Sequence, residues 1–586
     1  MFEEELEKEI IDKIGPSRAK KKKKIIIFSI VGIISLVIII AIVVFCILKF
    51  SGTKEEKKEE KKEEKKENIG KFECSYYNTM GEIKYIFSNK AKDLSPFEID
   101  VNGTKYNGTN VPLTHNGLIN VVITFNSPIN MDYLFADTQL DSIKIISAQK
   151  AVITSMTEAF SNCDRLNKFS ISGLDTSKVK NLSRLFYNNK ELEEVDFNDF
   201  NTENVEDMNE MFADCDRIES LDLSMFNTKN VKRMRRMFNK CKSLTKLDIS
   251  NFDTGNVEKM NKMFHFCTKL PELKIPKTFK TNKVTSMGHM FEYCSVLTSI
   301  DLSSFDTSSV TNMGRMFTYC KNVEYLDVTH FDTRKVQKMN DMFNKCTSLK
   351  SLDLTKFVTN NVFNMSSMFN SIKVQSLDLS NFNTSNVLDM NSMFKDITQI
   401  EYLDITSFHT SKVTVIESMF EGCINLKKIE INPEEFDTRN VINMAKLFYN
   451  CKLLTNINLS KFDTNNVENM KRMFAGCESF TSLNLSSFDT SNVKNMEEMF
   501  SGLSLTSLDL RRFSTYEVTT LQKMFYGSKN LKIIDLYNFN THKCTNFEQI
   551  IDGIENLTVI LSKNKTEENQ GLIDALGNNA YVTFIE

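Results

Sequence analysis

The sequence lacks tryptophan altogether, although it contains 45 phenylalanines and 28 methionines. A bias of this kind among the apolar residues is typical of a chain in which one short pattern has been copied many times. With 41% hydrophobic and 25% charged residues, most of the chain is expected to fold. The formal net charge of −3 gives no general reason for a polyanionic partner, so we expect no binding of nucleic acid.

Motifs that would indicate an enzyme are also missing from the sequence. The 6 histidines are scattered and form no H-E-x-x-H pair, and there is no G-x-S-x-G, no P-loop and no dinucleotide fingerprint after a strand. No two cysteines have the C-x-x-C spacing of a zinc or redox site. We therefore expect a protein that is not an enzyme and that has no cofactor and no metal site.

A long uncharged run lies near the N-terminus. Residues 25–48 read IIIFSIVGIISLVIIIAIVVFCIL, which is long enough to span a bilayer. Arg18 and the lysines at 20–24 precede it, and positive charges stay on the cytoplasmic side. The sequence therefore predicts a cytoplasmic tail (1–24), a retained transmembrane helix (25–48) and an extracellular remainder, in a single-pass protein of the cell membrane.

The segment that follows, residues 49–70, is rich in lysine and glutamate. Its charges repeat every four residues, so that Glu55 faces Glu59 on a helix and Lys58 faces Lys62. Like charges at this spacing repel and weaken a helix. We interpret the segment as a solvated stalk between the membrane and the folded part.

Phenylalanine then recurs at steps of 25–28 residues, about 26 on average. This regular spacing predicts a solenoid of about 17 units of about 26 residues, with Ile551 in the last of these positions. The ladder phenylalanines are Phe135, Phe160, Phe186, Phe212, Phe238, Phe264, Phe291, Phe317, Phe343, Phe369, Phe394, Phe420, Phe448, Phe474, Phe500 and Phe525.

Two periodicities alternate within each unit. In residues 310–320 the apolar side chains fall on one face of a helix, and Thr307 and Ser308 precede them in capping positions. Leu326-Asp327-Val328 alternates like a short strand with the aspartate outward. The pattern predicts an α/β solenoid that resembles leucine-rich repeats, with a parallel sheet on one wall and short helices on the other.

Ten cysteines lie three residues after a ladder phenylalanine. Ile372, Ile397 and Leu503 replace cysteine at this position in other units, which favours buried, unpaired thiols over disulfides. An extracellular location would permit disulfides, which we keep as the alternative. These ladder cysteines are Cys163, Cys215, Cys241, Cys267, Cys294, Cys320, Cys346, Cys423, Cys451 and Cys477.

The segments at the two ends of the solenoid do not follow the repeat. Residues 71–127 contain alternating apolar runs and the turn pairs Asn102-Gly103 and Asn107-Gly108, which predict hairpins in a β-rich N-terminal cap. We place the solenoid at 128–562 and a C-terminal cap at 563–586, and at this end of the chain LTVIL, NQGLIDAL and AYVTFI suggest a strand, a helix and a strand. Such caps cover the open ends of a sheet.

The repeated pattern L-D-[LI]-S-x-F-[DN]-T-x-x-V-x-x-M-x-x-M-F-x-x-C, well preserved in 221–241 and 483–500, closely resembles the repeat of BspA-like leucine-rich-repeat surface proteins. The same repeat occurs in mycoplasma surface lipoproteins. The resemblance implies a leucine-rich-repeat-like solenoid with a role in surface attachment or recognition, and it implies no catalytic residues. The chain differs from lipidated relatives in its anchor, because residues 25–48 take the place of a lipobox.

A row of outward aspartates follows the predicted strands and is the candidate ligand strip. One interpretation is architectural, with each aspartate bonded to nearby polar groups such as Ser224 or Thr329. The other is a binding strip for a cationic protein surface or for Ca²⁺. The row consists of Asp196, Asp222, Asp248, Asp301, Asp327, Asp353, Asp378, Asp404, Asp509 and Asp535. Asn102 and Asn107 lie in N-x-T sequons within expected turns and are possible glycosylation sites.

The sequence thus predicts a membrane-anchored cell-surface repeat protein that mediates adhesion or recognition through its solenoid surface. Its partners would be the membrane, through residues 25–48, and an extracellular protein or cell-surface ligand. A passive structural coat or spacer protein is the alternative. If the topology were reversed, an intracellular protein-docking scaffold would take its place.

Overall fold

The computed structural model describes residues 69–78, 86–91, 98–107, 111, 116–126, 128–146 and 151–586. The chain divides into two units, Met1–Glu67 and Asn68–Glu586, and every described residue belongs to the second. The expected cytoplasmic tail, the span at 25–48 and nearly all of the stalk therefore lie outside the described residues. Among the residues that are described, no helix has the length and apolar character needed to cross a membrane.

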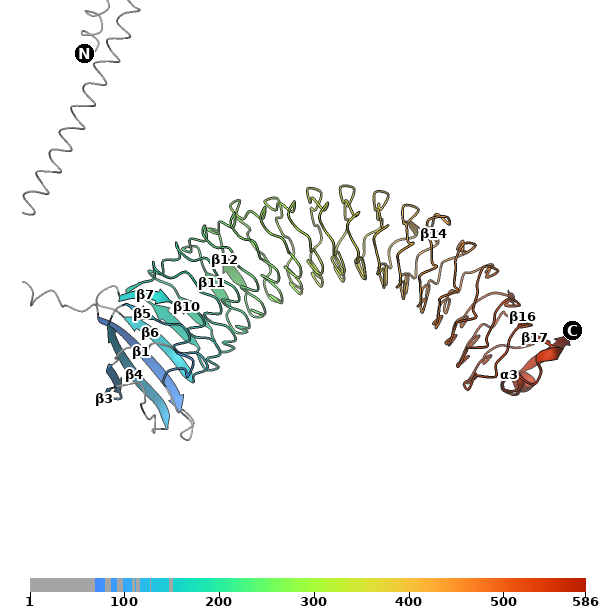
Figure 1. Cartoon of the computed structure of the whole chain (residues 1–586), viewed down its shortest axis with the longest axis horizontal. Helices are drawn as coiled ribbons and strands as arrows, with labels where there is room; N and C mark the ends of the chain where they lie inside the picture. Colours follow the sequence, from blue (N-terminus) through green and yellow to red (C-terminus); the bar gives the residue numbers. More distant parts are fainter. Residues whose placement is uncertain are drawn as a thin grey trace, which may run out of the picture. The chain divides into compact units, whose positions relative to one another are not determined.

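The repeats wind into a β-solenoid of about 17 turns, which Figure 1 shows as a series of stacked coils. Parallel strand pairs join successive coils, as the repeat predicted. The pairs are β6 (Leu140–Ile146) with β8 (Lys168–Ile171), β8 with β10 (Glu194–Asp196), β11 (Ser220–Asp222) with β12 (Lys246–Asp248), β13 (Tyr402–Asp404) with β14 (Lys428–Glu430), and β15 (Ser507–Asp509) with β16 (Ile533–Asp535).

A second row of parallel contacts runs along another side of the coils. It begins with β5 (Ile129–Asn130), β7 (Ala151–Ser155) and β9 (Leu174–Asp175). Single bridges such as Asn181–Asp207 continue it from coil to coil. The fold therefore consists of short bridging segments on more than one side of each coil, as in a β-solenoid.

The prediction of short helices along one wall is wrong. In residues 310–320 alternate amides bond to the next coil: Met313 N donates to Lys338 O (3.0 Å) and Phe317 N to Met342 O (3.0 Å). The amides between them close tight turns, as Met316 N does on Met313 O (3.1 Å). A helix would direct every amide to a carbonyl within its own coil and would leave the neighbouring coil unpaired.

Backbone conformation rules out a helix in the same segment. Arg315 and Tyr319 have φ values of 60° and 61°, in the left-handed region that a right-handed helix does not contain. Their counterparts in other coils, such as Arg236 and Lys240, have φ values of 55° and 60°. Consecutive turns place apolar side chains inward at every third residue, as a helix does, so the apolar spacing could not distinguish the two.

Thr307, which we expected to cap a helix, instead belongs to a ladder of buried threonines. Thr228 shows the arrangement: its hydroxyl donates to Asp253 O in the next coil and accepts from Asp253 N, both at 2.8 Å. One side chain thus satisfies both backbone groups of a residue in the neighbouring coil. The threonine ladder consists of Thr176, Thr202, Thr228, Thr254, Thr281, Thr307, Thr333, Thr359, Thr384, Thr410, Thr438, Thr464, Thr490, Thr515 and Thr541.

The ladder phenylalanines stack on one another through the core. The rings of Phe420 and Phe448, for example, lie 5.6 Å apart with their planes 1° from parallel. A second row of buried phenylalanines faces them, in which Phe279 and Phe305 stack at 5.7 Å. The ladder cysteines lie beside the first row. All 12 cysteines in the described residues are buried free thiols, which confirms the interpretation of the ten ladder cysteines as buried and unpaired.

The segment before the solenoid pairs directly with its first coils. A 7-stranded sheet has the order β10-β8-β6-β1-β4-β2-β3, in which β1 (Ile69–Asn78) pairs antiparallel with both β6 and β4 (Gly117–Asn126). Strands β2 (Glu98–Val101) and β3 (Thr104–Asn107) form the expected hairpin, with φ values of 48° at Asn102 and 88° at Gly103 in its turn. Residues 81–87, GEIKYIF, read as a further strand in the sequence, but Ile86 and Phe87 form a bend.

The C-terminal segment has the strand, helix and strand that the sequence predicted. Strand β17 (Leu557–Ser562) pairs with β16, and after η3 (Lys563–Lys565), α3 (Gln570–Leu576) and η4 (Gly577–Asn579) the strand β18 (Ala580–Ile585) pairs with β17. Leu572 and Leu576 of α3 are buried. The helix therefore covers the core at the last coils.

Candidate functional site

The predicted aspartate row lies at the ends of the short strands, one aspartate per coil. In each of its ten members Oδ1 accepts a hydrogen bond from the backbone N–H two residues later, at 2.9–3.1 Å. Eight of the ten are exposed, while Asp248 is half-buried and Asp535 is buried against Arg511. One oxygen of each carboxylate therefore closes a local turn.

These turns also shape the electrostatics of the row. Hydrogen bonds from the Ser224 and Ser303 side chains, with those from their backbone amides, lower the pKa of Asp222 and Asp301. The strand register places Asp222 beside Asp248 and Asp509 beside Asp535. The row is thus a line of carboxylates whose near oxygens are already engaged in closing local turns.

The two possible glycosylation sites lie on one hairpin. Asn102 is exposed in the turn between β2 and β3, and its Oδ1 accepts from Asn120 N at 3.1 Å. Asn107 ends β3.

Sequence reasoning missed a column of aromatic side chains on a different side of the coils. Phe266 and Tyr293 stack with ring centroids 4.1 Å apart, and Tyr293 and Tyr319 follow at 4.3 Å. We call these three residues the aromatic column. Each directly precedes a ladder cysteine, and their φ values of 60°, 63° and 61° are left-handed.

Lysines flank one end of the aromatic column. Lys345 Nζ lies 4.7 Å from the ring centroid of Tyr319 and donates to its hydroxyl at 2.6 Å, while Lys321 Nζ lies 5.5 Å from the same ring. The hydrogen bond from Lys345 lowers the pKa of Tyr319, whereas burial raises that of Tyr293. The column is therefore a half-buried aromatic surface with positive charge at its edge.

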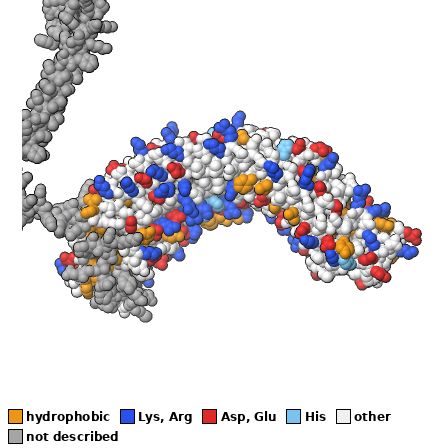
Figure 2. Space-filling model, in the orientation of Figure 1, with side chains coloured by type: hydrophobic (Ala, Val, Ile, Leu, Met, Phe, Trp, Pro, Cys, Tyr) orange, Lys and Arg blue, Asp and Glu red, His pale blue; other side chains and the backbone are white. Residues whose placement is uncertain are grey.

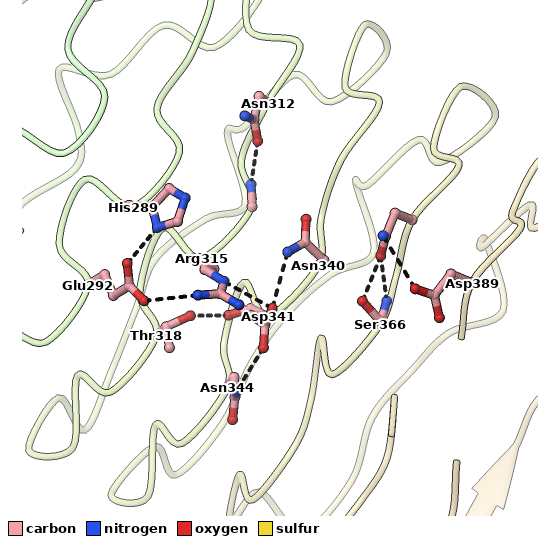
Figure 3. Close-up of polar contacts among 12 residues, drawn as sticks. His289, Glu292, Asn312, Arg315, Thr318, Asn340, Asp341, Asn344, Ser366 and Asp389 are labelled. Atoms are coloured by element: carbon pink, nitrogen blue, oxygen red, sulfur yellow. Dashed lines mark hydrogen bonds and ion pairs between the residues drawn. The ribbon is translucent and has the colours of Figure 1, made fainter. Parts of the chain in front are cut away.

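A cluster of titratable side chains lies beside the aromatic column. His265 Nε2 is 3.0 Å from Glu292 Oε2, and His289 Nδ1 is 2.5 Å from the same oxygen (Figure 3 shows the second contact). Burial opposes ionisation of Glu292, but its contacts with the two histidines outweigh this effect and lower the pKa of the carboxyl to about 2. Burial lowers the pKa of His265 against the opposing effect of Glu292.

Arginine and asparagine side chains extend this cluster into the next coils (Figure 3). Arg315 Nη1 lies 3.7 Å from Glu292 Oε1, and its Nε lies 3.3 Å from Asp341 Oδ2. The carboxylate of Asp341 also accepts from Asn344 Nδ2 at 2.7 Å and Asn340 Nδ2 at 3.1 Å. The result is a continuous polar network across successive coils.

The repeat itself carried a signal for this cluster. His265 and Glu292 each directly follow a ladder phenylalanine, and His289 stands two positions before one. Residues one repeat apart lie side by side in a solenoid. Sorting the polar residues by their position in the repeat, rather than searching for local motifs, would have brought the three together.

Elsewhere the surface charges pair between coils. Lys232 bonds Glu206 and Lys242 bonds Asp216, each at 2.8 Å across about one repeat. Figure 2 shows positive and negative side chains interspersed along the visible face of the solenoid. Charge of one sign therefore does not distinguish this face.

Comparison with protein families identifies the repeat. The family described as "Mycoplasma protein of unknown function, DUF285" matches residues 154–275, 272–380, 345–452, 424–533 and 484–576. Comparison with curated proteins gave no match. Because the five overlapping matches run along nearly the whole solenoid, the chain belongs to the DUF285 family.

Proposed function

We propose that this chain is a membrane-anchored cell-surface protein and that its solenoid mediates adhesion or recognition by binding an extracellular protein or cell-surface ligand at the aromatic column. The apolar run at 25–48 would be the anchor, with the solenoid outside the cell. Membership of a repeat family and the resemblance to BspA-like surface proteins support this proposal. The observation that carries it is the aromatic column itself.

The backbone at the column does not require aromatic side chains. Gly422, Gly476 and Gly502 occupy the same position in other coils with φ values of 70–74°, and Asn450 does so with 58°. Bulky residues with left-handed backbone are uncommon because their side chains crowd the main chain. Three aromatic residues in consecutive coils are a departure from the glycine and asparagine that suit this backbone best, although Lys240 and Lys345 hold the same position in the flanking coils.

Stacking only partly explains this departure. A pair of stacked aromatic rings contributes about 0.5–1.5 kcal/mol, whereas a strained backbone conformation costs about 1–3 kcal/mol per residue. Tyrosine and phenylalanine are enriched where proteins bind partners, because they offer large contact areas with few rotatable bonds. A recognition role explains why the column is kept at a position where glycine or asparagine suits the backbone better.

The test compares a tyrosine inside the aromatic column with one outside it. Tyr293→Asn removes the centre of the column and suits left-handed backbone. Tyr402→Asn is the control outside the column, because Tyr402 is 51% exposed and lies beside a lysine as Tyr319 does, with Lys428 Nζ 5.8 Å from its ring. The purified full chain is applied to intact cells and to matrix proteins. We expect Tyr293→Asn to lose binding and Tyr402→Asn to retain it.

Two outcomes would contradict the proposal. Equal binding by the two variants would remove the column from the contact surface. A C-terminal tag that is labelled only after cells are permeabilised would place the solenoid away from the cell surface, and the recognition function would then be intracellular docking.

A further inference from the structure

The three side chains of His265, His289 and Glu292 converge on one point. One ligand atom from each lies within 4.8 Å of the others, and no other such group of three occurs in the part of the chain that the structure describes. Both imidazoles approach the same atom, Glu292 Oε2. Glu292 is only 5% exposed at its side chain, so its carboxylate is held within the coil stack.

Hydrogen bonding assigns the proton of His265. Its Nδ1 lies 2.7 Å from Asn239 Oδ1, and Asn239 Nδ2 faces Asp214 Oδ2 at 3.4 Å, which fixes the orientation of the amide. An amide oxygen only accepts, so His265 Nδ1 carries the hydrogen. When the ring is neutral, Nε2 presents its lone pair to the carboxylate oxygen of Glu292 at 3.0 Å.

Two acceptors that face each other repel unless a cation lies between them. The cation can be a proton on Nε2 or a metal ion. A hydrogen bond from the outer ring nitrogen to a protein oxygen is the usual companion of a histidine that binds metal, because it fixes the tautomer and the ring orientation. Asn239 supplies such a bond to His265.

We propose that His265 Nε2, His289 Nδ1 and the Glu292 carboxylate bind one Zn²⁺ ion. This site is independent of the proposed recognition function. Two imidazole nitrogens and a carboxylate form a ligand set that suits zinc, and solvent would supply a fourth ligand. The donor set is poor for Ca²⁺ and Mg²⁺, which prefer oxygen ligands.

The site must open slightly to admit the ion. Zinc bonds of about 2.0–2.2 Å in a tetrahedral arrangement place ligand atoms roughly 3.3 Å apart. The contacts of 3.0 Å and 2.5 Å to Glu292 Oε2 must therefore lengthen by less than about 1 Å. His289 can make this movement and leaves a path for the ion, because its side chain is 29% exposed.

Nearby positive charges moderate the affinity without blocking the site. Arg315 approaches Glu292 Oε1, the oxygen that does not face the histidines, and it also pairs with Asp341. Lys262 is a second nearby cation and interacts with both His265 and Glu292. The charges of Glu292, Arg315 and Asp341 together leave one net negative charge, and Lys262 offsets it.

The experiment titrates ZnCl₂ into the full chain by calorimetry, in a Cys46→Ser background that removes the one cysteine outside the described residues. We compare the parent with His289→Gln and with His409→Gln. His409 is the matched control because its Nδ1 contacts Glu435 Oε2 at 2.6 Å in a histidine–glutamate pair that lacks a third ligand.

We expect one Zn²⁺ per chain in the parent and in His409→Gln, and binding at least tenfold weaker in His289→Gln. Asn239→Ala should weaken binding by about 10- to 100-fold, as loss of a supporting hydrogen bond does at other metal sites. Zinc should also raise the melting temperature of the parent and of His409→Gln but not of His289→Gln.

An absence of saturable zinc binding in the parent would overturn the proposal and leave a proton-bridged ion pair at this position. Equal zinc affinity in the parent and His289→Gln would overturn it too, because the ion would then bind elsewhere. His289 is partly exposed, so its variant is expected to fold, and a melting curve of the zinc-free variant checks this.

Discussion

The thiol of Cys320 donates a hydrogen bond of 3.2 Å to the carbonyl oxygen of Phe291 in the preceding coil. All ten ladder cysteines make this contact, with sulfur–oxygen distances of 3.0–3.3 Å. Where the position holds another donor the contact persists, since Asn189 bonds Phe160 O and Ser528 bonds Phe500 O, both at 2.8 Å. The residue at the cysteine position therefore donates a hydrogen bond to a buried carbonyl oxygen and also fills the core.

This arrangement predicts thiols that are inert in the native protein. Burial raises the pKa of Cys294, Cys346 and Cys423 to about 12, so almost none of the reactive thiolate exists at pH 8. In a Cys46→Ser background we expect a thiol reagent to label none of these cysteines while the chain stays folded. All 12 remaining cysteines should react once the chain is unfolded in guanidinium.

Cys544 is the internal control for this labelling. It is the most exposed of the described cysteines, at 9%, and lies near the C-terminal end of the solenoid. It should therefore be the first to react when the native protein is held with reagent for long periods. Fast labelling of Cys294 or Cys346 ahead of Cys544 would show that the ladder thiols are not enclosed.

The sequence was a good guide wherever a side chain is repeated for packing. The spacing of Phe317 and its equivalents predicted both the solenoid and the coil length, because a residue that stacks on its own copy must recur once per coil. The parallel pairing around Asp222 and Asp248 followed from the same argument. The burial of the cysteines followed from their replacement by isoleucine and leucine.

The same pattern could not show whether these segments form helices or turns. An apolar residue at every third position satisfies a helix and a series of turns equally well, and only the backbone decides between them. The decisive contacts, such as Phe317 N to Met342 O, join residues 25 apart in sequence. The His265–Glu292 contact was missed for a related reason, since local motifs do not register pairs one repeat apart.

The threonine ladder predicts a difference between two conservative substitutions. Thr228→Val keeps the shape of the side chain but removes the group that bonds both Asp253 N and Asp253 O. Leaving such buried groups without a partner costs about 1–3 kcal/mol. We expect Thr228→Val to lower the free energy of unfolding in urea by that amount and to speed hydrogen exchange at the Asp253 amide.

Thr228→Ser is the matched control, because serine retains the hydroxyl. Its loss of stability should be well below that of Thr228→Val and should leave the Asp253 amide protected. If valine and serine destabilised the chain equally, the methyl group rather than the hydroxyl would be the important part of the threonine.

In the aspartate row, one kind of substitution, aspartate to asparagine, separates a role in the turns from a role in binding. Asn458 and Asn484 occupy the same position in two coils and accept the same turn-closing bonds, from Ser460 N at 3.1 Å and Ser486 N at 3.0 Å. A variant with Asp301, Asp327 and Asp353 changed to asparagine should therefore remain folded at pH 7. If the row binds Ca²⁺ or a cationic protein surface, this variant loses that binding while its melting curve is unchanged.

Acid sensitivity gives an independent measure of the same carboxylates. Hydrogen bonds from Ser303, Thr329 and Thr355 hold the pKa of Asp301, Asp327 and Asp353 below their usual value. A folded-state pKa below the unfolded one stabilises the fold above the unfolded value, and that contribution is lost as the pH falls through the folded value. The parent should therefore lose stability as the pH drops below about 4, and the triple asparagine variant should lose less over the same range. Identical acid-unfolding curves would mean that these carboxylates do not stabilise the turns that they close.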